Sequence, residues 1–276
     1  MDCNSSDYFR DVICLRSTMI LFCWGRFNFV LVFFQIGWYN ECVMKNYILP
    51  YDYDTLAFIV ISTPDMFDKA FKPFVCRQDC NGGRDLIDEC MVDFIFQETI
   101  KYSLFDFFFL KNFPDEEIEI IHDFELHHTR RPKVLVQTAG HVAGAAYYYQ
   151  ASDVKNVPWD KSQVNIKIFG VSVHPKYGGW FALRGVIIFK NVKCVNLEKK
   201  SPSDCVSTDE LKIELLNRYN FQWQDWSFRD IVPSDKKYCE EQKKYFATLP
   251  KDRQELIEQI KTTGHIEVDD VTGLQK

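Results

Sequence analysis

Aromatic, amide and arginine side chains occur together in three segments of this sequence. The segments are 140–150 (GHVAGAAYYYQ), 174–185 (HPKYGGWFALRG) and 221–230 (FQWQDWSFRD). The familiar catalytic signatures are missing from the sequence, which has no P-loop, no GxGxxG after a strand, no HExxH and no GxSxG. An enzyme without a nucleophile of its own often takes its reactivity from a cofactor, while the protein binds and orients the reactants. The three segments therefore indicate a binding site with no catalytic acid, base or nucleophile.

Individual side chains in these segments also have plainer interpretations. A single histidine among small residues, such as His141, is typical of a hydrogen-bonded core residue as well as of a ligand contact. Arg184 differs because it lies inside the apolar run WFALRGVIIF (180–189), where an unpaired charge would be costly. We therefore expect Arg184 to have a dedicated anionic partner, although an ordinary ion pair is the alternative.

The composition limits the class of protein. The chain has 276 residues, enough for one large domain or a core with a smaller addition, and 24 Phe and 13 Tyr suggest either a large flat ligand or a Phe-rich core. The net charge is −6 with no long Lys/Arg cluster, which argues against nucleic-acid binding. The ten cysteines show no paired spacing, so we expect reduced thiols, and no site for a protein-bound metal.

One segment, 19–35 (MILFCWGRFNFVLVFFQ), resembles a signal sequence or membrane span. Arg26 and Asn28 interrupt it, and no small-residue cleavage site follows. We therefore expect no membrane segment here, and instead an apolar strand pair that turns at Gly25-Arg26.

The first half of the chain mixes strand and helix patterns. Residues 55–63 predict a buried strand, followed by a helix with Thr63 as N-cap that ends at Pro73. A second helix follows the break at 81–83, with a core-facing stripe of Ile87, Cys90, Met91, Phe94 and Ile95. Residues 117–126 predict a strand, and 127–132 a polar loop.

The second half begins with a predicted helix in 134–150, whose small residues would allow a neighbouring backbone or a flat ligand to approach closely. Residues 165–173 and 180–189 predict an antiparallel hairpin. After a linker at 199–203, a capping box of Ser207 and Glu210 is predicted to open a helix. Two further helices are expected around 236–247 and 250–262, and the tail from His265 is expected to be unstructured. This order predicts an α+β core with a smaller helical addition.

Several strings in the sequence resemble the MMACHC (CblC) family of vitamin B12 metabolism. They are FQIGWYNE (34–41), ISTPDMFDKAFKPF (61–74), RRPKVLVQTAGHVAGAAYYYQ (130–150), GVSVHPKYGGWFALRGV (170–186), FQWQDWSFRD (221–230) and EEQKKYF (240–246). The resemblance covers the chain from about Phe34 to Glu255 in unbroken order. It implies a flavin-reductase or nitroreductase-like α+β core with an antiparallel sheet and flanking helices, and a C-terminal helical cap.

The resemblance also implies an activity and a set of site residues. Family members bind cob(III)alamin base-off and remove its upper axial ligand, by glutathione-dependent dealkylation of alkylcobalamins and by reductive decyanation of cyanocobalamin with electrons from FAD or FMN. Some also oxidise glutathione as a side activity. A cobalamin chaperone without turnover is the alternative. The cobalamin-binding positions carried over by motif are Asp123, Val134, Leu135, Val136, Gln137, His141, Tyr148, Tyr149, Gln150, Phe169 and Leu183. The glutathione-binding positions are Arg184, Arg229 and Arg253, with Tyr238 and Trp226 facing the ligand.

Further expectations concern organisation and partners. We expect a poorly matched segment over 1–33, a cobalamin-binding core over 34–198, a cap over 199–264 and a tail over 265–276. By resemblance, the partners are a downstream cobalamin trafficking protein and a flavin reductase, and the location is the cytoplasm. The loop before Arg130 reads His-His-Thr where the family form has Pro-Asn, so a monomer and a flavin-linked homodimer both stay open.

Overall fold

A five-stranded antiparallel sheet forms the centre of the protein. The computed structural model describes residues 22–24, 28–77, 85–94, 117–159 and 167–272. The strands lie in the order β1 (Phe22–Trp24), β2 (Phe29–Gln35), β3 (Thr55–Ser62), β7 (Ala182–Lys193) and β4 (Ile118–His122). All four neighbouring pairs are antiparallel, and β1 pairs with β2 as the predicted strand pair. The expected α+β core with an antiparallel sheet is therefore confirmed.

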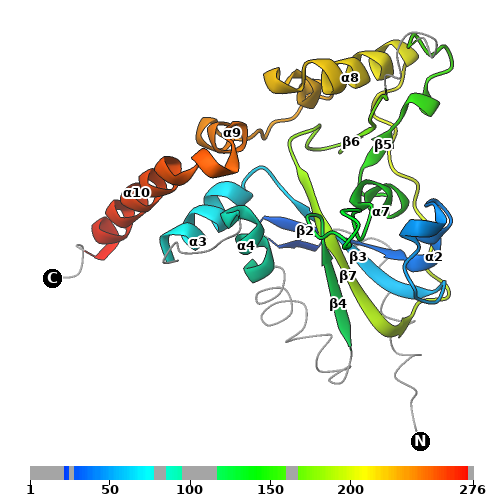
Figure 1. Cartoon of the computed structure of the whole chain (residues 1–276), viewed down its shortest axis with the longest axis horizontal. Coiled ribbons are helices and arrows are strands. Elements are labelled where there is room, and N and C mark those ends of the chain that lie inside the picture. Colours follow the sequence, from blue (N-terminus) through cyan, green and yellow to red (C-terminus); the bar gives the residue numbers. More distant parts are fainter. Residues whose placement is uncertain (1–21, 25–27, 78–84, 95–116, 160–166, 273–276) are drawn as a thin grey trace, which may run out of the picture.

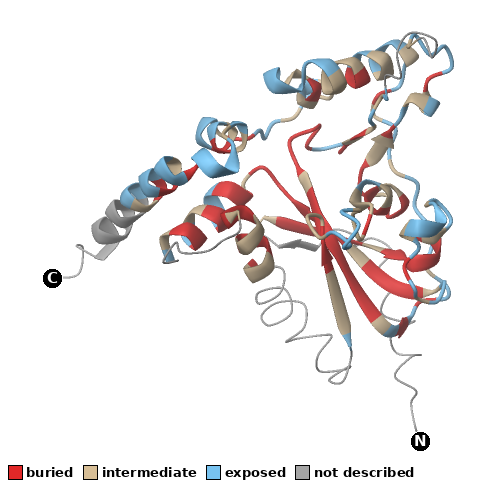
Figure 2. Ribbon diagram, viewed as in Figure 1, coloured by how far each residue is buried: buried red, intermediate tan, exposed pale blue. Residues whose placement is uncertain are grey.

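Both faces of this sheet are covered, which explains its nearly continuous apolar strands. Successive residues of β2 enter different cores: Phe29 and Leu31 pack on one side, and Val30 and Val32 on the other. Figure 1 shows α3 (Lys72–Arg77) and α4 (Leu86–Val92) on one side, and α2 (Ile36–Asn40) and α7 (Val136–Val142) on the other. In Figure 2 the central strands are largely buried, while the outer helices expose one surface.

A second unit packs beside the end of the sheet. Strands β5 (Tyr147–Tyr149) and β6 (Val171–Val173) pair with each other and share a core with α8 (Asp209–Phe221). Two short turns, η6 (Trp223–Asp225) and η7 (Ser227–Asp230), then lead to α9 (Glu240–Ala247), η8 (Pro250–Asp252) and α10 (Gln254–Thr272). In Figure 1 these C-terminal helices form an oblique row that begins above the sheet with α8 and ends with α10 beside α3. Two further short helices among the described residues are η1 (Lys45–Tyr47) and η5 (Ala151–Asp153).

The predicted hairpin of 165–173 with 180–189 is wrong. β6 pairs with β5, whereas β7 lies between β3 and β4, so both of its edges are occupied. The connecting turn closes on itself through a bridge between His174 and Gly178, which directs the chain out of one sheet and into the other. The predicted helix in 134–150 is also shorter than expected, because Gly144 with φ of +72° follows α7 and the tyrosines continue as a strand.

Two further boundaries differ from the predictions. Pro73 does not end the helix after β3: the chain makes a π-helical turn (η2, Phe67–Phe71) that runs directly into α3, where Pro73 is the second residue. Thr63 does not cap this helix, since its hydroxyl has no partner. The backbone of α10 continues to Thr272, past His265, where an unstructured tail was expected.

Other predicted elements are confirmed. The stripe on α4 is buried as expected at Ile87, Cys90, Met91 and Phe94, while Ile95 lies outside the described residues. The helix after the linker forms, although its N-cap is Thr208 and not Ser207. No helix in the part of the chain that the structure describes is long and apolar enough to cross a membrane.

Candidate functional site

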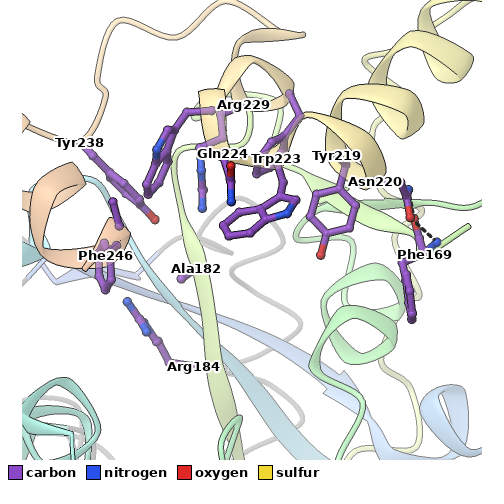
Figure 3. Close-up of a pocket in the computed structure, with 13 residues that line it drawn as sticks. Phe169, Ala182, Arg184, Tyr219, Asn220, Trp223, Gln224, Arg229, Tyr238 and Phe246 are labelled. Atoms are coloured by element: carbon purple, nitrogen blue, oxygen red, sulfur yellow. Dashed lines mark hydrogen bonds between the residues drawn. The ribbon is translucent and has the colours of Figure 1, made fainter. Parts of the chain in front are cut away.

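A cavity of about 740 Å³ lies between the end of the central sheet and the segment 219–247. Figure 3 shows Arg184 entering it from the sheet, while Tyr238, Arg229, Trp223 and Tyr219 line it from the C-terminal segment. Its walls carry many aromatic rings and two arginines. The lining residues are Phe169, Ala182, Arg184, Tyr219, Asn220, Trp223, Gln224, Trp226, Phe228, Arg229, Tyr238, Phe246 and Ala247.

A β-bulge places Arg184 at this cavity. On β3, Val60 pairs with Gly185 and Ile61 pairs with Leu183, so Arg184 is the extra residue on β7. Gly185 has φ of +144°, and a Cβ there would lie 2.4 Å from the Ile121 carbonyl oxygen. Only glycine suits this position, and the bulge turns Arg184 away from the regular ladder.

The guanidinium of Arg184 is buried and hydrogen-bonded to a neutral group. The side chain is 8% exposed, and its Nε donates a hydrogen bond of 2.8 Å to Ser62 Oγ. None of the described carboxylates pairs with it, although Asp88 and Asp123 lie close enough to interact electrostatically. Burial raises the pKa of both carboxyls, that of Asp88 to about 6, and the positive charge of Arg184 opposes this effect. The described carboxyls therefore compensate the positive charge of Arg184 only in part.

Arg229 sits in a box of aromatic rings. Its guanidinium carbon lies 4.9 Å from the ring centre of Trp226, 5.0 Å from those of Phe228 and Tyr238, and 5.7 Å from that of Trp180. One terminal nitrogen donates to the Gly179 carbonyl, and the buried Nε has no acceptor. Like Arg184, this arginine has no ion pair with any carboxylate in the described ranges.

Trp226 adopts an unusual backbone conformation beside Arg229. Its φ of 64° lies in the left-handed region, which a bulky residue rarely occupies. This conformation separates η6 from η7 and stacks its indole on Trp180, with an interplanar angle of 2°. The sequence prediction that Trp226 and Tyr238 lie with Arg229 at one site therefore agrees with the geometry.

Arg253, the third arginine predicted to bind glutathione, has a different environment. It lies outside the residues that line the cavity and forms an ion pair with Asp85. Its Nε also donates to the carbonyls of Tyr245 at 3.1 Å and Thr248 at 2.9 Å. The structure thus brings two of the three arginines together at the cavity, and a role for Arg253 in binding stays a prediction.

A second cavity of about 380 Å³ lies beside α7 and β5. His141 lines it, but the Nδ1 of this histidine also accepts a hydrogen bond of 3.1 Å from the backbone N–H of Tyr148. Burial lowers the pKa of His141, which favours the neutral ring that this acceptor role requires. Five predicted cobalamin-binding residues line this cavity: Leu135, Gln137, His141, Tyr148 and Gln150.

The other predicted cobalamin-binding residues are dispersed. Phe169 lines the larger cavity, where the side chain of Asn220 holds its backbone through hydrogen bonds of 2.8 and 3.0 Å (Figure 3). Tyr149 is fully buried, and its hydroxyl donates to Asp204 and accepts from the N–H of Val206. Val134 and Leu183 are core residues, whereas Val136 and Asp123 are half-buried and line neither cavity.

Several cavity residues were missed in the sequence. Trp223 and Gln224 lie in a segment that was singled out, but neither was assigned a role. Tyr219 and Asn220 lie in the helix that the capping box opens, and Phe246 ends the string EEQKKYF, but none of the three was assigned a role. In the second cavity Cys42 and Met44 were missed, because their loop shows no recognisable pattern.

The described residues contain no group of three or more His, Cys, Asp or Glu side chains placed to hold a metal ion.

Six cysteines in the described ranges, at positions 42, 76, 90, 194, 205 and 239, carry free thiols. Burial raises the pKa of the thiol of Cys194 to about 12, so this group stays protonated at neutral pH.

Known proteins resemble this chain over most of its length. A chicken (Gallus gallus) cyanocobalamin reductase / alkylcobalamin dealkylase is 48% identical over 233 residues, which cover 84% of this chain and 92% of the relative. The human protein of the same name is 44% identical over 231 residues, covering 84% of this chain and 77% of the relative. The crystal structure of a C. elegans B12-trafficking protein CblC matches with a TM-score of 0.74 and 31% identity, covering 93% of this chain and 97% of that one. Residues 28–257 match the model of the methylmalonic aciduria and homocystinuria type C (MMACHC) family, and the chain belongs to that family.

Proposed function

We propose that this protein removes the upper axial ligand of cobalamins, by reductive decyanation of cyanocobalamin and by dealkylation of alkylcobalamins. Relatives that are 44–48% identical over most of the chain carry both activities in their names. One observation supports glutathione as the thiol that accepts the alkyl group: Arg184 and Arg229 face the same cavity, and neither has a carboxylate partner among the described residues. Guanidinium groups bind carboxylates in a two-pronged geometry, and glutathione carries two carboxylates.

In the proposed dealkylation, the glutathione thiolate attacks the carbon that is bound to cobalt. The new sulfur–carbon bond gives a thioether, while the cobalt–carbon bond breaks and leaves its electron pair on cobalt as cob(I)alamin. No side chain has to act as a nucleophile. Arg184 and Arg229 would hold the carboxylates so that the thiolate lies in line with the bond that breaks, which is a task of positioning. The aromatic walls would exclude water from the reacting atoms.

We further propose that decyanation uses FAD or FMN at the same cavity. A flavin ring is flat and largely apolar, and the rings of Trp223 and Tyr219 on the cavity wall offer surfaces on which it could stack. Reduced flavin would supply the electrons that reduce cobalt(III), and cyanide would leave as its bond to cobalt breaks. The half-buried Tyr148 and the exposed Gln150 of the second cavity would offer hydroxyl and amide partners for the amide side chains of the corrin ring.

The finer features of organisation are also part of the proposal. The antiparallel core would correspond to a flavin-reductase or nitroreductase-like domain, with the helices from α8 onward as its cap. The expected cobalamin trafficking partner, the flavin reductase and the cytoplasmic location are proposed from the family resemblance alone. The domain limits at residues 33, 198 and 264, and the choice between a monomer and a flavin-linked homodimer, stay predictions.

An anaerobic absorbance titration of the full chain tests the function. Methylcobalamin should shift to the base-off spectrum on binding and convert to cob(I)alamin only after glutathione is added, whereas cyanocobalamin should require reduced flavin. Arg184→Lys keeps the positive charge but loses the planar guanidinium that can donate two hydrogen bonds to one carboxylate. It should raise the KM for glutathione and leave cobalamin binding intact. A base-off shift without turnover under either condition would contradict the enzyme and favour a cobalamin chaperone.

A further inference from the structure

The two arginines of the cavity are both held by acceptors that carry no charge. Arg184 donates to a serine hydroxyl and Arg229 donates to a peptide carbonyl. Arg253, outside the cavity, is held by the carboxylate of Asp85. A neutral acceptor fixes the orientation of a guanidinium and leaves its positive charge available, whereas a carboxylate fixes it and also cancels the charge.

We propose that Ser62 is the positioning residue for Arg184, and that its hydroxyl aims the guanidinium into the cavity without neutralising it. This inference rests on the proposed function, because it assigns Ser62 to the site that binds the thiol cosubstrate. Ser62 is the last residue of β3, is 2% exposed and pairs with Ala182, itself a cavity residue. Its Oγ accepts the hydrogen bond of 2.8 Å from Arg184 Nε, across 122 positions of sequence.

The surroundings of Arg184 explain why this hydrogen bond matters. The half-buried carboxyls of Asp88 and Asp123 lie near enough for Arg184 to influence their protonation, but neither forms an ion pair with it. One buried carboxyl oxygen, Asp123 Oδ1, has no hydrogen-bond partner. If the hydroxyl of Ser62 were removed, the freed guanidinium would turn toward these carboxyls, and its charge would no longer be available to a ligand.

Ser62→Ala tests this role through the kinetics of methylcobalamin dealkylation. The loss of a hydrogen bond to a charged group should raise the KM for glutathione about ten- to a hundredfold. The affinity for methylcobalamin should stay close to that of the unsubstituted protein. Ser62→Thr, which keeps the hydroxyl, should restore most of the glutathione affinity. Thr63→Val is the matched control, because Thr63 is a buried neighbour whose hydroxyl has no partner.

A double substitution separates positioning of Arg184 from a general packing effect. In Arg184→Lys the Nε donor is gone, so adding Ser62→Ala should cause no further rise in KM. A full additional rise would show that Ser62 acts elsewhere and would overturn the proposal. If Ser62→Ala does not fold, Ser62→Cys is tested in its place. The thiol is a weaker hydrogen-bond acceptor than the hydroxyl, so the KM for glutathione should lie between the value of the unsubstituted protein and the value expected for Ser62→Ala. A KM equal to that of the unsubstituted protein would overturn the proposal.

The same experiment distinguishes failure of this inference from failure of the proposed function. An Arg184→Lys protein with an unchanged KM for glutathione would show that the cosubstrate does not bind at Arg184, so the proposed glutathione site and the role of Ser62 would both be refuted. A raised KM in Arg184→Lys together with an unchanged KM in Ser62→Ala would refute the role of Ser62 alone.

Discussion

Arg253→Ala should act mainly on stability, even though the family resemblance places Arg253 at the glutathione site. The side chains of the Arg253–Asp85 ion pair are 9% and 19% exposed, and two backbone carbonyls also accept hydrogen bonds from the guanidinium. Removing one partner of a buried pair leaves the other charge uncompensated, which costs about 3–5 kcal/mol. At about 2–4 °C per kcal/mol for a chain of this size, the melting temperature should fall by about 6–20 °C.

Thermal unfolding followed by circular dichroism measures this loss, and dealkylation kinetics at a temperature where the variant is folded measure the effect on binding. The double variant Asp85→Ala/Arg253→Ala serves as the control, since it removes both charges and should recover part of the lost stability. The expected KM for glutathione in Arg253→Ala is close to that of the unsubstituted chain. A melting temperature that does not change, together with a KM raised tenfold or more, would refute the reasoning and place Arg253 at the ligand.

Three further predictions follow from the contacts around the cavity. His174 is buried, its Nδ1 accepts hydrogen bonds from two backbone N–H groups, and burial lowers its pKa to about 4. The stability that the neutral ring contributes is therefore complete above the ordinary pKa of about 6.5 and should be lost as the pH falls toward 4. Urea unfolding should show a loss of about 3 kcal/mol over this range, and His174→Asn should weaken this pH dependence. Gly185→Ala should lower the free energy of unfolding by more than about 2 kcal/mol, because the new Cβ meets the Ile121 carbonyl, and an unchanged urea midpoint would contradict the bulge. Asn220→Ala should weaken cobalamin binding in absorbance titrations by about tenfold, because it releases the backbone of Phe169, and an unchanged affinity would mean that Phe169 does not contact the ligand.

The central strands and the α4 stripe were predictable because their pattern is local. Residues 56–61 form a continuous apolar run, which is what a strand buried on both faces requires. On α4 the helical spacing of Ile87, Cys90 and Met91 places them on one buried face. In both cases the residues that determine the structure are neighbours in sequence, and the protein around them does not alter the outcome.

The pairing of β6 could not be predicted in the same way. The run before His174 and the run after Trp180 have the lengths of a hairpin, but whether they pair depends on which strand edges are already occupied. The edges of β7 are taken by β3 and β4, and β3 ends more than a hundred residues earlier in the sequence. The partner of a strand is therefore a tertiary property that the intervening turn residues do not reveal.

The candidate site shows the same division at the level of single side chains. An arginine within an apolar run signals an unusual partner, and this reasoning drew attention to Arg184. Among the described residues it donates to the neutral hydroxyl of Ser62, and the expected anionic partner stays a prediction. The identity of the acceptor, Ser62, and the bulge that aims the side chain both arise from strands distant in sequence. Arg253 shows the reverse case: its acidic partner lies 168 residues away, so the sequence could not distinguish it from the cavity arginines.

The origin of the two cavity arginines connects the fold to the proposed chemistry. Arg184 comes from a strand bonded on both edges, so its backbone is held rigidly, whereas Arg229 comes from a short turn that follows the left-handed Trp226. The turn is fixed to the segment before β7 by paired hydrogen bonds between Gly179 and Arg229, one of them 2.9 Å from the Gly179 N–H. A Cβ on Gly179 would lie 2.6 Å from the Arg229 Cα, so only glycine permits this approach. Gly179 and the bulge therefore set the separation of the guanidinium groups of Arg184 and Arg229, which the two carboxylates of the proposed ligand would contact. A fixed separation of this kind is what in-line attack by a bound thiolate requires.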